Sequence, residues 1–173
     1  QAIEIAKRTG LPLRIAAKVD PADQTYYEAA IEPLLNPPLI EFIGEISDAE
    51  KNEFLGNAMA LVCPYDWPEP FGLVLIEALA CGTPVLAYRR GSIPEILDHG
   101  VIGFICQTVA ELVDAVGQIP LIDRRRCRAA FDERFTADRM ARDYVALYER
   151  LLEERLLEDG AVRAAQAFAS EED

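Results

Sequence analysis

Two glutamates flank the start of one strongly apolar segment that begins near Phe71. Glu69 precedes the segment in a loop that contains Pro and Gly, and Glu77 is the single charged residue inside it. The segment is predicted to be a helix that ends near Gly82, and a helix that is apolar on nearly all faces must be buried. Removing an unpaired carboxylate from water is costly. Glu77 therefore either meets a donor inside the protein or faces a polar opening and binds a ligand.

The first turn of this predicted helix is a candidate phosphate site. The first N–H groups of a helix have no intrahelical partner and carry a partial positive charge. Gly72 lets a ligand approach the backbone closely. Glu77 lies about 7–8 Å further along the axis at the usual rise per residue, which is a distance that separates a phosphate from a ribose, and a carboxylate accepts hydroxyl hydrogen bonds well. The alternative leaves Glu77 paired with a buried neighbour and Glu69 as a solvated loop residue.

The cysteines and the histidine do not predict a metal site. The cysteines show no C-x-x-C spacing, and His99 alone cannot build a histidine-rich zinc site. We expect reduced, buried or half-buried thiols at Cys63, Cys81, Cys106 and Cys127.

The composition is that of a globular domain, with 51% hydrophobic and 27% charged residues among 173. The formal net charge of −13 argues against binding to nucleic acid or to anionic membranes in general. It does not exclude one small anionic ligand held by a helix N-terminus and a few arginines. No apolar run reaches the roughly 20 residues that a transmembrane helix needs, and no signal peptide is evident.

Short apolar runs alternate with helical patterns along the chain. The runs are uninterrupted, which is typical of a parallel sheet covered by helices on both faces, so we predict an α/β, Rossmann-like fold. Residues 15–17 and 58–63 are expected to be buried. Predicted strands cover residues 11–19, 39–43, 58–63, 85–88 and part of 100–106, and predicted helices cover the start to Gly10, 22–35, 47–55, 92–98, 109–116, 124–135 and from about 136 or 138 onward.

Two capping boxes mark predicted helix starts, at Ser47–Glu50 and at Ser92–Glu95. We expect one domain over residues 1–157 and an acidic C-terminal tail over residues 158–173, weakly structured or frayed after Gly160. The chain begins at Gln1 within an apparent helix and therefore looks like part of a longer protein. Ligands of such sheets bind beyond the C-terminal ends of the strands, where the loop at Gly44 and Glu45 and the loop before Phe71 lie.

The segment EPFGLVLIEALACGTPVLA, which contains Glu69 and Glu77, resembles the E-x7-E segment of family 4 (group 1) retaining glycosyltransferases, which have the GT-B fold. Further segments follow in the order typical of that family over nearly the whole chain. They are Leu13–Ala16, Phe42–Gly44, Ala60–Pro64, Arg90–Glu95 and Gly100–Phe104. The resemblance implies that the chain is the C-terminal, donor-binding half of such an enzyme.

The resemblance also implies roles for individual residues. Glu69 matches the glutamate at the donor sugar and is the candidate catalytic residue. The candidate donor-binding residues are Phe71, Gly72 and Leu73, through backbone amides, Glu77 at the ribose, and Gly44 and Glu45 near the nucleobase. The resemblance also implies that no cofactor or bound metal is required and that a nucleotide-diphosphate sugar is the donor substrate.

Some positions depart from the family pattern. The loop from Pro64 to Glu69 is longer than usual and lacks the common serine, and the arginine and lysine that neutralise the diphosphate in the family lie upstream of Gln1. Arg89 and Arg90 either add charge near the donor or form a solvated turn, and we favour the solvated turn. Trp67 either stacks on a sugar or covers the loop, and we favour the second role. Arg124–Arg126 is expected to be a solvated helix face.

We therefore expect the donor-binding domain of a cytoplasmic glycosyltransferase that moves a hexose from a nucleotide-diphosphate sugar to an acceptor hydroxyl. Its expected partner is the acceptor-binding N-terminal half, which could also bring it to a membrane surface, and this chain alone should have little turnover. The alternative is a non-catalytic nucleotide-sugar-binding or regulatory module. A response-regulator-like or dehydrogenase domain is disfavoured, since no G-x-G-x-x-G follows the first visible strand.

Overall fold

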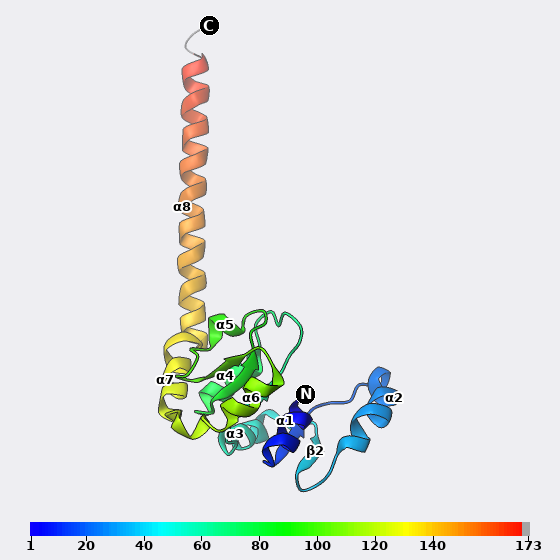
Figure 1. The fold of residues 1–173 in the computed structure, drawn as a ribbon. Coiled ribbons are helices and arrows are strands. Elements are labelled where there is room, and N and C mark those ends of the chain that lie inside the picture. Colours follow the sequence, from blue (N-terminus) through cyan, green and yellow to red (C-terminus); the bar gives the residue numbers. More distant parts are fainter. Residues whose placement is uncertain (171–173) are drawn as a thin grey trace. The chain divides into compact units, whose positions relative to one another are not determined.

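The computed structural model describes residues 1–170 of the chain, and side chains as far as residue 157. The chain divides into two compact units, residues 1–132 and 133–173. The first unit contains all the strands and every candidate site residue (Figure 1). The domain boundary expected at residues 157 and 158 stays a prediction, and the last acidic residues, 171–173, lie outside the described part.

A two-stranded parallel sheet follows the first helix. Helix α1 (Ala2–Thr9) ends at Gly10, which adopts the left-handed conformation with φ 69° and lets the chain turn into β1 (Leu13–Ala16). Strand β1 pairs with β2 (Ile40–Gly44). The helical run expected at residues 22–35 is present as short pieces, which are η1 (Pro21–Asp23), α2 (Gln24–Tyr26), η2 (Tyr27–Ile31) and η3 (Glu32–Leu34).

A second parallel sheet has the strand order β3-β4-β5. Its strands are β3 (Leu61–Cys63), β4 (Val85–Tyr88) and β5 (Gly103–Cys106). All residues of the central strand β4 are buried, because helices α4 (Leu73–Ala80) and α6 (Val109–Val116) contact it (Figure 1). The predicted fold class, an α/β protein with parallel sheets covered by helices, is confirmed.

The sheet is divided, however, where a single sheet was expected. Strands β1 and β3 belong to different sheets and do not pair with each other. The expectation that residues 15–17 and 58–63 are buried is therefore largely wrong. Ile15 and Val62 are only half-buried and Ala17 is exposed, whereas Cys63 is buried. A strand without a neighbour on one side leaves that edge, and part of its side chains, uncovered.

One of the two expected capping boxes forms. Helix α3 (Asp48–Gly56) begins at Ser47, whose side chain accepts from the Glu50 amide while the Glu50 carboxylate accepts from the Ser47 amide. The second prediction was wrong, because Ser92 makes no side-chain cap on α5 (Ile93–Ile96). Its hydroxyl instead donates to the Phe71 carbonyl oxygen at 2.9 Å, and this long-range bond removes the side chain from the helix start.

Arg124, at the start of α7 (Arg124–Arg134), was expected to belong to a solvated helix face. It does not. Its guanidinium is partly buried and donates to the carbonyl oxygens of Ala58 and Gly56, each at 2.7 Å. It also donates to the Thr83 hydroxyl at 2.8 Å. Thr83 in turn donates to the Leu55 carbonyl oxygen at 2.7 Å. This cluster joins the end of α3 and the turn before β4 to the start of α7.

The second unit consists mainly of one long helix, α8 (Ala137–Ser170). The backbone stays helical through Asp159 and Gly160, so the weakly structured segment expected after Gly160 is helical as far as Ser170. In the described part of the chain, no helix combines the length and the apolar character that crossing a membrane requires.

Candidate functional site

The Glu69 carboxylate caps the N-terminal end of α4. Its Oε1 accepts from the Gly72 amide at 3.1 Å, and its Oε2 accepts from the Trp67 indole N–H at 3.1 Å. Gly72 precedes α4 in the left-handed conformation, with φ 79°, which a residue with a side chain adopts only at a cost. The carboxylate thus satisfies one of the amides that a helix start leaves unpaired, and Glu69 is fixed to the loop and helix on which the sequence placed it.

The turn after β4 supports the Glu69 loop from behind. The Ser92 amide donates to the Glu69 carbonyl oxygen at 3.0 Å, and the Ser92 hydroxyl holds the Phe71 carbonyl oxygen. Gly91 has φ 49°, and a Cβ at this position would overlap the backbone of Glu69 and Pro68. Only glycine fits this close approach between two backbones. This contact joins segments that are distant in the sequence, and no local pattern at Gly91 or Ser92 predicts it.

The side chains of the loop before α4 pair with one another. Trp67 stacks on Tyr65, with ring centroids 4.7 Å apart, and Arg90 forms an ion pair with Asp66 at 3.3 Å. These contacts support the readings in which Trp67 covers the loop and Arg90 belongs to an exposed turn. Arg90 and Asp66 are exposed, so their pair contributes little to stability and serves to join the two loops.

Glu77 has a donor inside the protein. Its Oε1 accepts from the Lys51 ammonium of α3 at 2.9 Å, and the same ammonium lies 3.1 Å from Asp48 Oδ1. The Glu77 side chain remains 37% exposed, so it reaches the surface and is not enclosed in the core. The two possibilities left open for Glu77, an internal donor or access to a ligand, therefore do not exclude each other. The carboxylate is paired with Lys51 and is also accessible to a ligand.

Exposed side chains flank Gly72 at the start of α4, although Gly72 itself is buried. The Gly72 amide is occupied by the Glu69 carboxylate, so the amides of Leu73 and Val74, in the first turn, are the ones that a ligand could bind. Phe71 and Leu73 are 46% and 65% exposed. Both side chains therefore stand in solvent beside the first turn of the helix.

Gly44 and Glu45 lie at the C-terminal end of β2, in the other sheet. Gly44 has φ 76° and an open space where a Cβ would stand, and Glu45 is exposed. Within the part of the chain that the structure describes, neither residue forms a hydrogen bond or an ion pair with Glu69 or Glu77. They are connected to the site through the chain, because the loop from Glu45 to Ser47 leads into α3, whose Lys51 holds Glu77.

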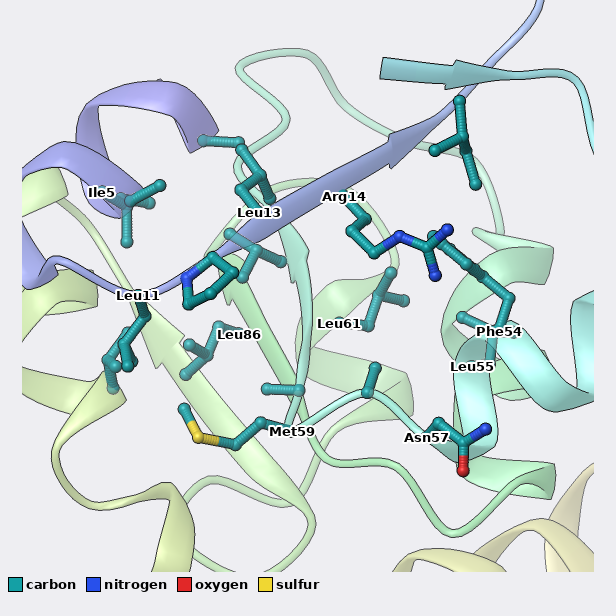
Figure 2. Close-up of a pocket in the computed structure, with 18 of the residues that line it drawn as sticks. Ile5, Leu11, Leu13, Arg14, Phe54, Leu55, Asn57, Met59, Leu61 and Leu86 are labelled. Atoms are coloured by element: carbon teal, nitrogen blue, oxygen red, sulfur yellow. The ribbon is translucent and has the colours of Figure 1, made fainter. Parts of the chain in front are cut away.

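A cavity of about 540 Å³ lies away from these residues, between the two sheets. Figure 2 shows Leu13 and Arg14 of β1 over the same space as Leu61 of β3 and Leu86 of β4. Ile5 of α1 and Phe54 of α3 also line it. Neither Glu69, Gly72 nor Glu77 lines this cavity, so the site identified from the carboxylates and the cavity are different places.

The cysteines match the expectation of reduced thiols. All four are free, with Cys63, Cys106 and Cys127 buried and Cys81 half-buried. Burial raises the pKa of Cys63, Cys106 and Cys127 to about 11 in each case. These thiols therefore stay protonated near neutral pH and are poor nucleophiles.

The chain resembles known proteins in sequence. The family model described as "Glycosyl transferases group 1" matches residues 1–132. A probable sucrose-phosphate synthase from Thermosipho melanesiensis is 30% identical over 152 residues, which are 83% of this chain and 35% of that protein. A glycogen synthase from Mycobacterium tuberculosis is 38% identical over 102 residues, 56% of this chain and 24% of that protein. The chain thus spans about a third or less of these relatives.

Solved structures with the same fold include HepE from Anabaena in complex with UDP-glucose, with a TM-score of 0.72 and 22% identity over 87% of this chain and 45% of that one. Sucrose-phosphate synthase from Thermosynechococcus elongatus gives a TM-score of 0.71 and 24% identity over 88% of this chain and 42% of that one. At this identity the likeness concerns the fold, which is that of one half of the GT-B glycosyltransferases.

Proposed function

The chain belongs to the group 1 glycosyl transferase family, and we propose that it is the donor-binding domain of a retaining glycosyltransferase. In the proposed reaction, a hexose passes from a nucleotide-diphosphate sugar to an acceptor hydroxyl. The observation that carries the proposal is the start of α4, where Glu69 is fixed beside open helix amides and Glu77 reaches the surface from the same helix. These groups suit a sugar, a diphosphate and a ribose in that order.

Each group has a proposed task. The diphosphate would accept hydrogen bonds from the Leu73 and Val74 amides, where the helix dipole favours negative charge. The ribose hydroxyls would donate to Glu77, and Glu69 would face the sugar. Gly44 and Glu45 would lie near the base. The complexes of HepE with UDP-glucose and with UDP support a uracil nucleotide as the first donor to test.

The catalytic step would be driven by electrostatic stabilisation. As the glycosidic bond to the diphosphate breaks, positive charge develops on the sugar ring and negative charge on the leaving group. Preorganised amides stabilise such charge without reorganisation, and the Glu69 carboxylate would lie near the cationic ring. We propose that no bound metal is required. The test is turnover in the presence of EDTA, and loss of activity that Mg²⁺ restores would contradict it.

A segment outside this chain would complete the enzyme. The proposed acceptor-binding N-terminal half would bring the acceptor and further cationic groups to the diphosphate. A further strand in the sheet of this domain is a separate proposal, which the cavity between β1 and β3 supports. Two parallel sheets whose facing edges are unpaired leave room for one more parallel strand, and Ala2 of α1 lines the same space. A strand that enters α1 and then β1 would form the usual right-handed βαβ unit.

A non-catalytic nucleotide-sugar-binding module is the second candidate. In such a module Glu69 would serve only its structural task, which is to cap α4 and hold Trp67. Both candidates predict nucleotide binding, and only the enzyme predicts that sugar is released from the donor.

The experiment is a thermal-shift screen of the full-length protein against UDP, GDP and ADP sugars, followed by a turnover assay with the donor that binds. A ligand that binds only the folded state raises the melting temperature by mass action. A shift with turnover supports the enzyme, and a shift without turnover or donor hydrolysis supports the module. No shift with any donor would contradict both.

A further inference from the structure

Lys51 is the one lysine that the structure places against a candidate site residue, among the residues it describes. Its ammonium lies between two carboxylates, 2.9 Å from Glu77 Oε1 and 3.1 Å from Asp48 Oδ1. The Lys51 side chain is only 33% exposed, whereas that of Asp48 is 96% exposed. The three groups form a small ionic cluster in which Glu77 is the inner member and Asp48 the outer one.

The position of Lys51 is fixed by the helix that carries it. The Ser47–Glu50 capping box fixes the start of α3. The hydrogen bonds from Thr83 to Leu55 and from Arg124 to Gly56 hold its end. Helix α3 also packs against α4. The ion pair therefore joins two anchored helices and does not depend on two mobile surface side chains, which gives the pair a defined geometry.

The pair matters most when a ligand covers Glu77. A carboxylate that loses water must gain donors, and an unpaired one is strongly disfavoured. Lys51 already supplies one charged donor to Oε1, which leaves further lone pairs on both oxygens for hydroxyl groups. Hydrogen bonding to Glu77, and then to Asp48, also raises the pKa of Lys51, so the ammonium stays protonated at neutral pH.

We propose that Lys51 is a positioning residue for the nucleotide. It holds the Glu77 carboxylate in one orientation and compensates its charge, so that the ribose hydroxyls find a preorganised acceptor. This inference rests on the proposed function, because it assumes that Glu77 binds ribose. Lys51 itself touches Glu77 and Asp48 and acts on the nucleotide through Glu77.

The test compares nucleotides with and without ribose hydroxyls. Calorimetry measures the dissociation constants of UDP, GDP and ADP, and of their 2′,3′-dideoxy forms, for the full-length wild-type protein and for Lys51→Met. For the nucleotide that wild type binds, we expect Lys51→Met to weaken binding about tenfold. Binding of the matching dideoxy form should change less than about twofold, because the hydroxyls that Glu77 would accept from are absent. Lys51→Arg should restore most of the affinity.

The control is Lys7→Met, which removes the same charge from the exposed face of α1 and should leave both constants unchanged. A melting curve for each variant identifies loss of fold, and Lys51→Arg preserves the charge if Lys51→Met does not fold. Equal loss of affinity for the ribose and dideoxy forms would overturn the inference. Tighter binding by Lys51→Met would also overturn it, because Lys51 would then compete with the ribose for Glu77. In both cases ribose-dependent binding by wild type leaves the proposed function intact. No binding by wild type to any of the nucleotides contradicts the proposed function itself, and the inference with it.

Discussion

At the scale of single residues, Glu69 caps the start of α4 and is also the residue proposed to face the sugar. Both of its carboxylate oxygens accept hydrogen bonds within the protein, one from the Gly72 amide and one from the Trp67 indole. An acceptor with two lone pairs on each oxygen can still face a ligand while it keeps these bonds. The side chain is thus oriented before any substrate arrives, as a group that stabilises a transition state should be.

Replacing Glu69 by Gln tests the charge with little change of shape. We expect Glu69→Gln to lower kcat of the full-length enzyme by about 10²–10³, the range for losing one electrostatic stabiliser. The dissociation constant of the nucleotide diphosphate should change less than about threefold, because Glu69 faces the sugar. Stopped assays give kcat and calorimetry the affinity. A wild-type kcat in the variant would remove Glu69 from the site.

The cysteines provide a second test at this scale. Because burial raises the pKa of Cys63, Cys106 and Cys127 to about 11, their thiolate fraction at pH 7.5 is far below that of a free thiol. We expect iodoacetamide to label these three slowly in the folded protein and quickly in urea, as mass spectrometry of the peptides would show. Rapid labelling of Cys63 in the folded protein would contradict the described burial.

At the scale of elements, the turn after β4 positions the loop that carries Glu69. Gly91→Ala places a Cβ onto the backbone of Glu69 and at a left-handed φ. Gly100→Ala is the matched control, because Gly100 also has a left-handed φ of 78° and nothing within 4 Å of an added Cβ. Both changes should cost about 1–2 kcal/mol of stability for the backbone conformation, and Gly91→Ala should cost more because the backbone of Glu69 and Pro68 must also shift.

The two variants should differ in activity. Gly91→Ala should lower kcat at least about tenfold in addition, because small displacements of a catalytic group have large effects, while Gly100→Ala should keep the wild-type kcat. Urea unfolding and steady-state kinetics measure the two effects. Equal kinetics for both variants would mean that the Gly91 contact does not position Glu69.

The Arg124 cluster makes a prediction about stability alone. Arg124→Met leaves two carbonyl oxygens and the buried Thr83 hydroxyl without their shared donor. Loss of charged hydrogen bonds of this kind should lower the free energy of unfolding by about 2–4 kcal/mol. The control Arg126→Met, at an exposed position of the same helix, should change it by less than about 0.5 kcal/mol. Urea denaturation measures both.

The sequence was a good guide where structure depends on neighbours along the chain. The capping box at Ser47, the helix that ends at Gly10 and the helix after Gly72 were predicted from local patterns and are present. Contacts between distant segments were not predicted. Lys51 and Glu77 are 26 residues apart, and Ser92 and Phe71 are 21 apart. Nothing in the local pattern of Ser92 distinguishes a helix cap from a long-range donor, and so that prediction failed.

At the scale of the whole molecule, the divided sheet is the largest departure from expectation. The apolar runs at residues 11–19, 58–63 and 85–88 predicted strands of a sheet that is covered on both faces. The strand β4 is buried throughout, whereas most residues of β1 and β3 are not. Sequence patterns report how apolar a strand is and not which neighbour covers it. The cavity between the sheets is thus consistent with strands whose neighbour lies outside this chain.

The gap makes a prediction about the full-length protein. The Leu13 amide donates toward β2 and the Leu61 amide toward β4, so the next amides along, those of Arg14 and Val62, point into the gap. If an N-terminal strand fills it, these two amides should exchange with solvent at least about tenfold more slowly in the full-length protein than in residues 1–173. Equal exchange in both proteins, measured by NMR, would mean that no strand enters.

We propose that one nucleotide lies along the start of α4, and a crystal structure of the full-length protein with UDP bound would show whether it does. We expect phosphate oxygens within hydrogen-bonding distance of the Leu73 and Val74 amides, and ribose hydroxyls on Glu77 with Lys51 still on Oε1. A nucleotide bound elsewhere, such as in the cavity lined by Leu13 and Leu61, or a UDP whose ribose does not touch Glu77, would contradict it.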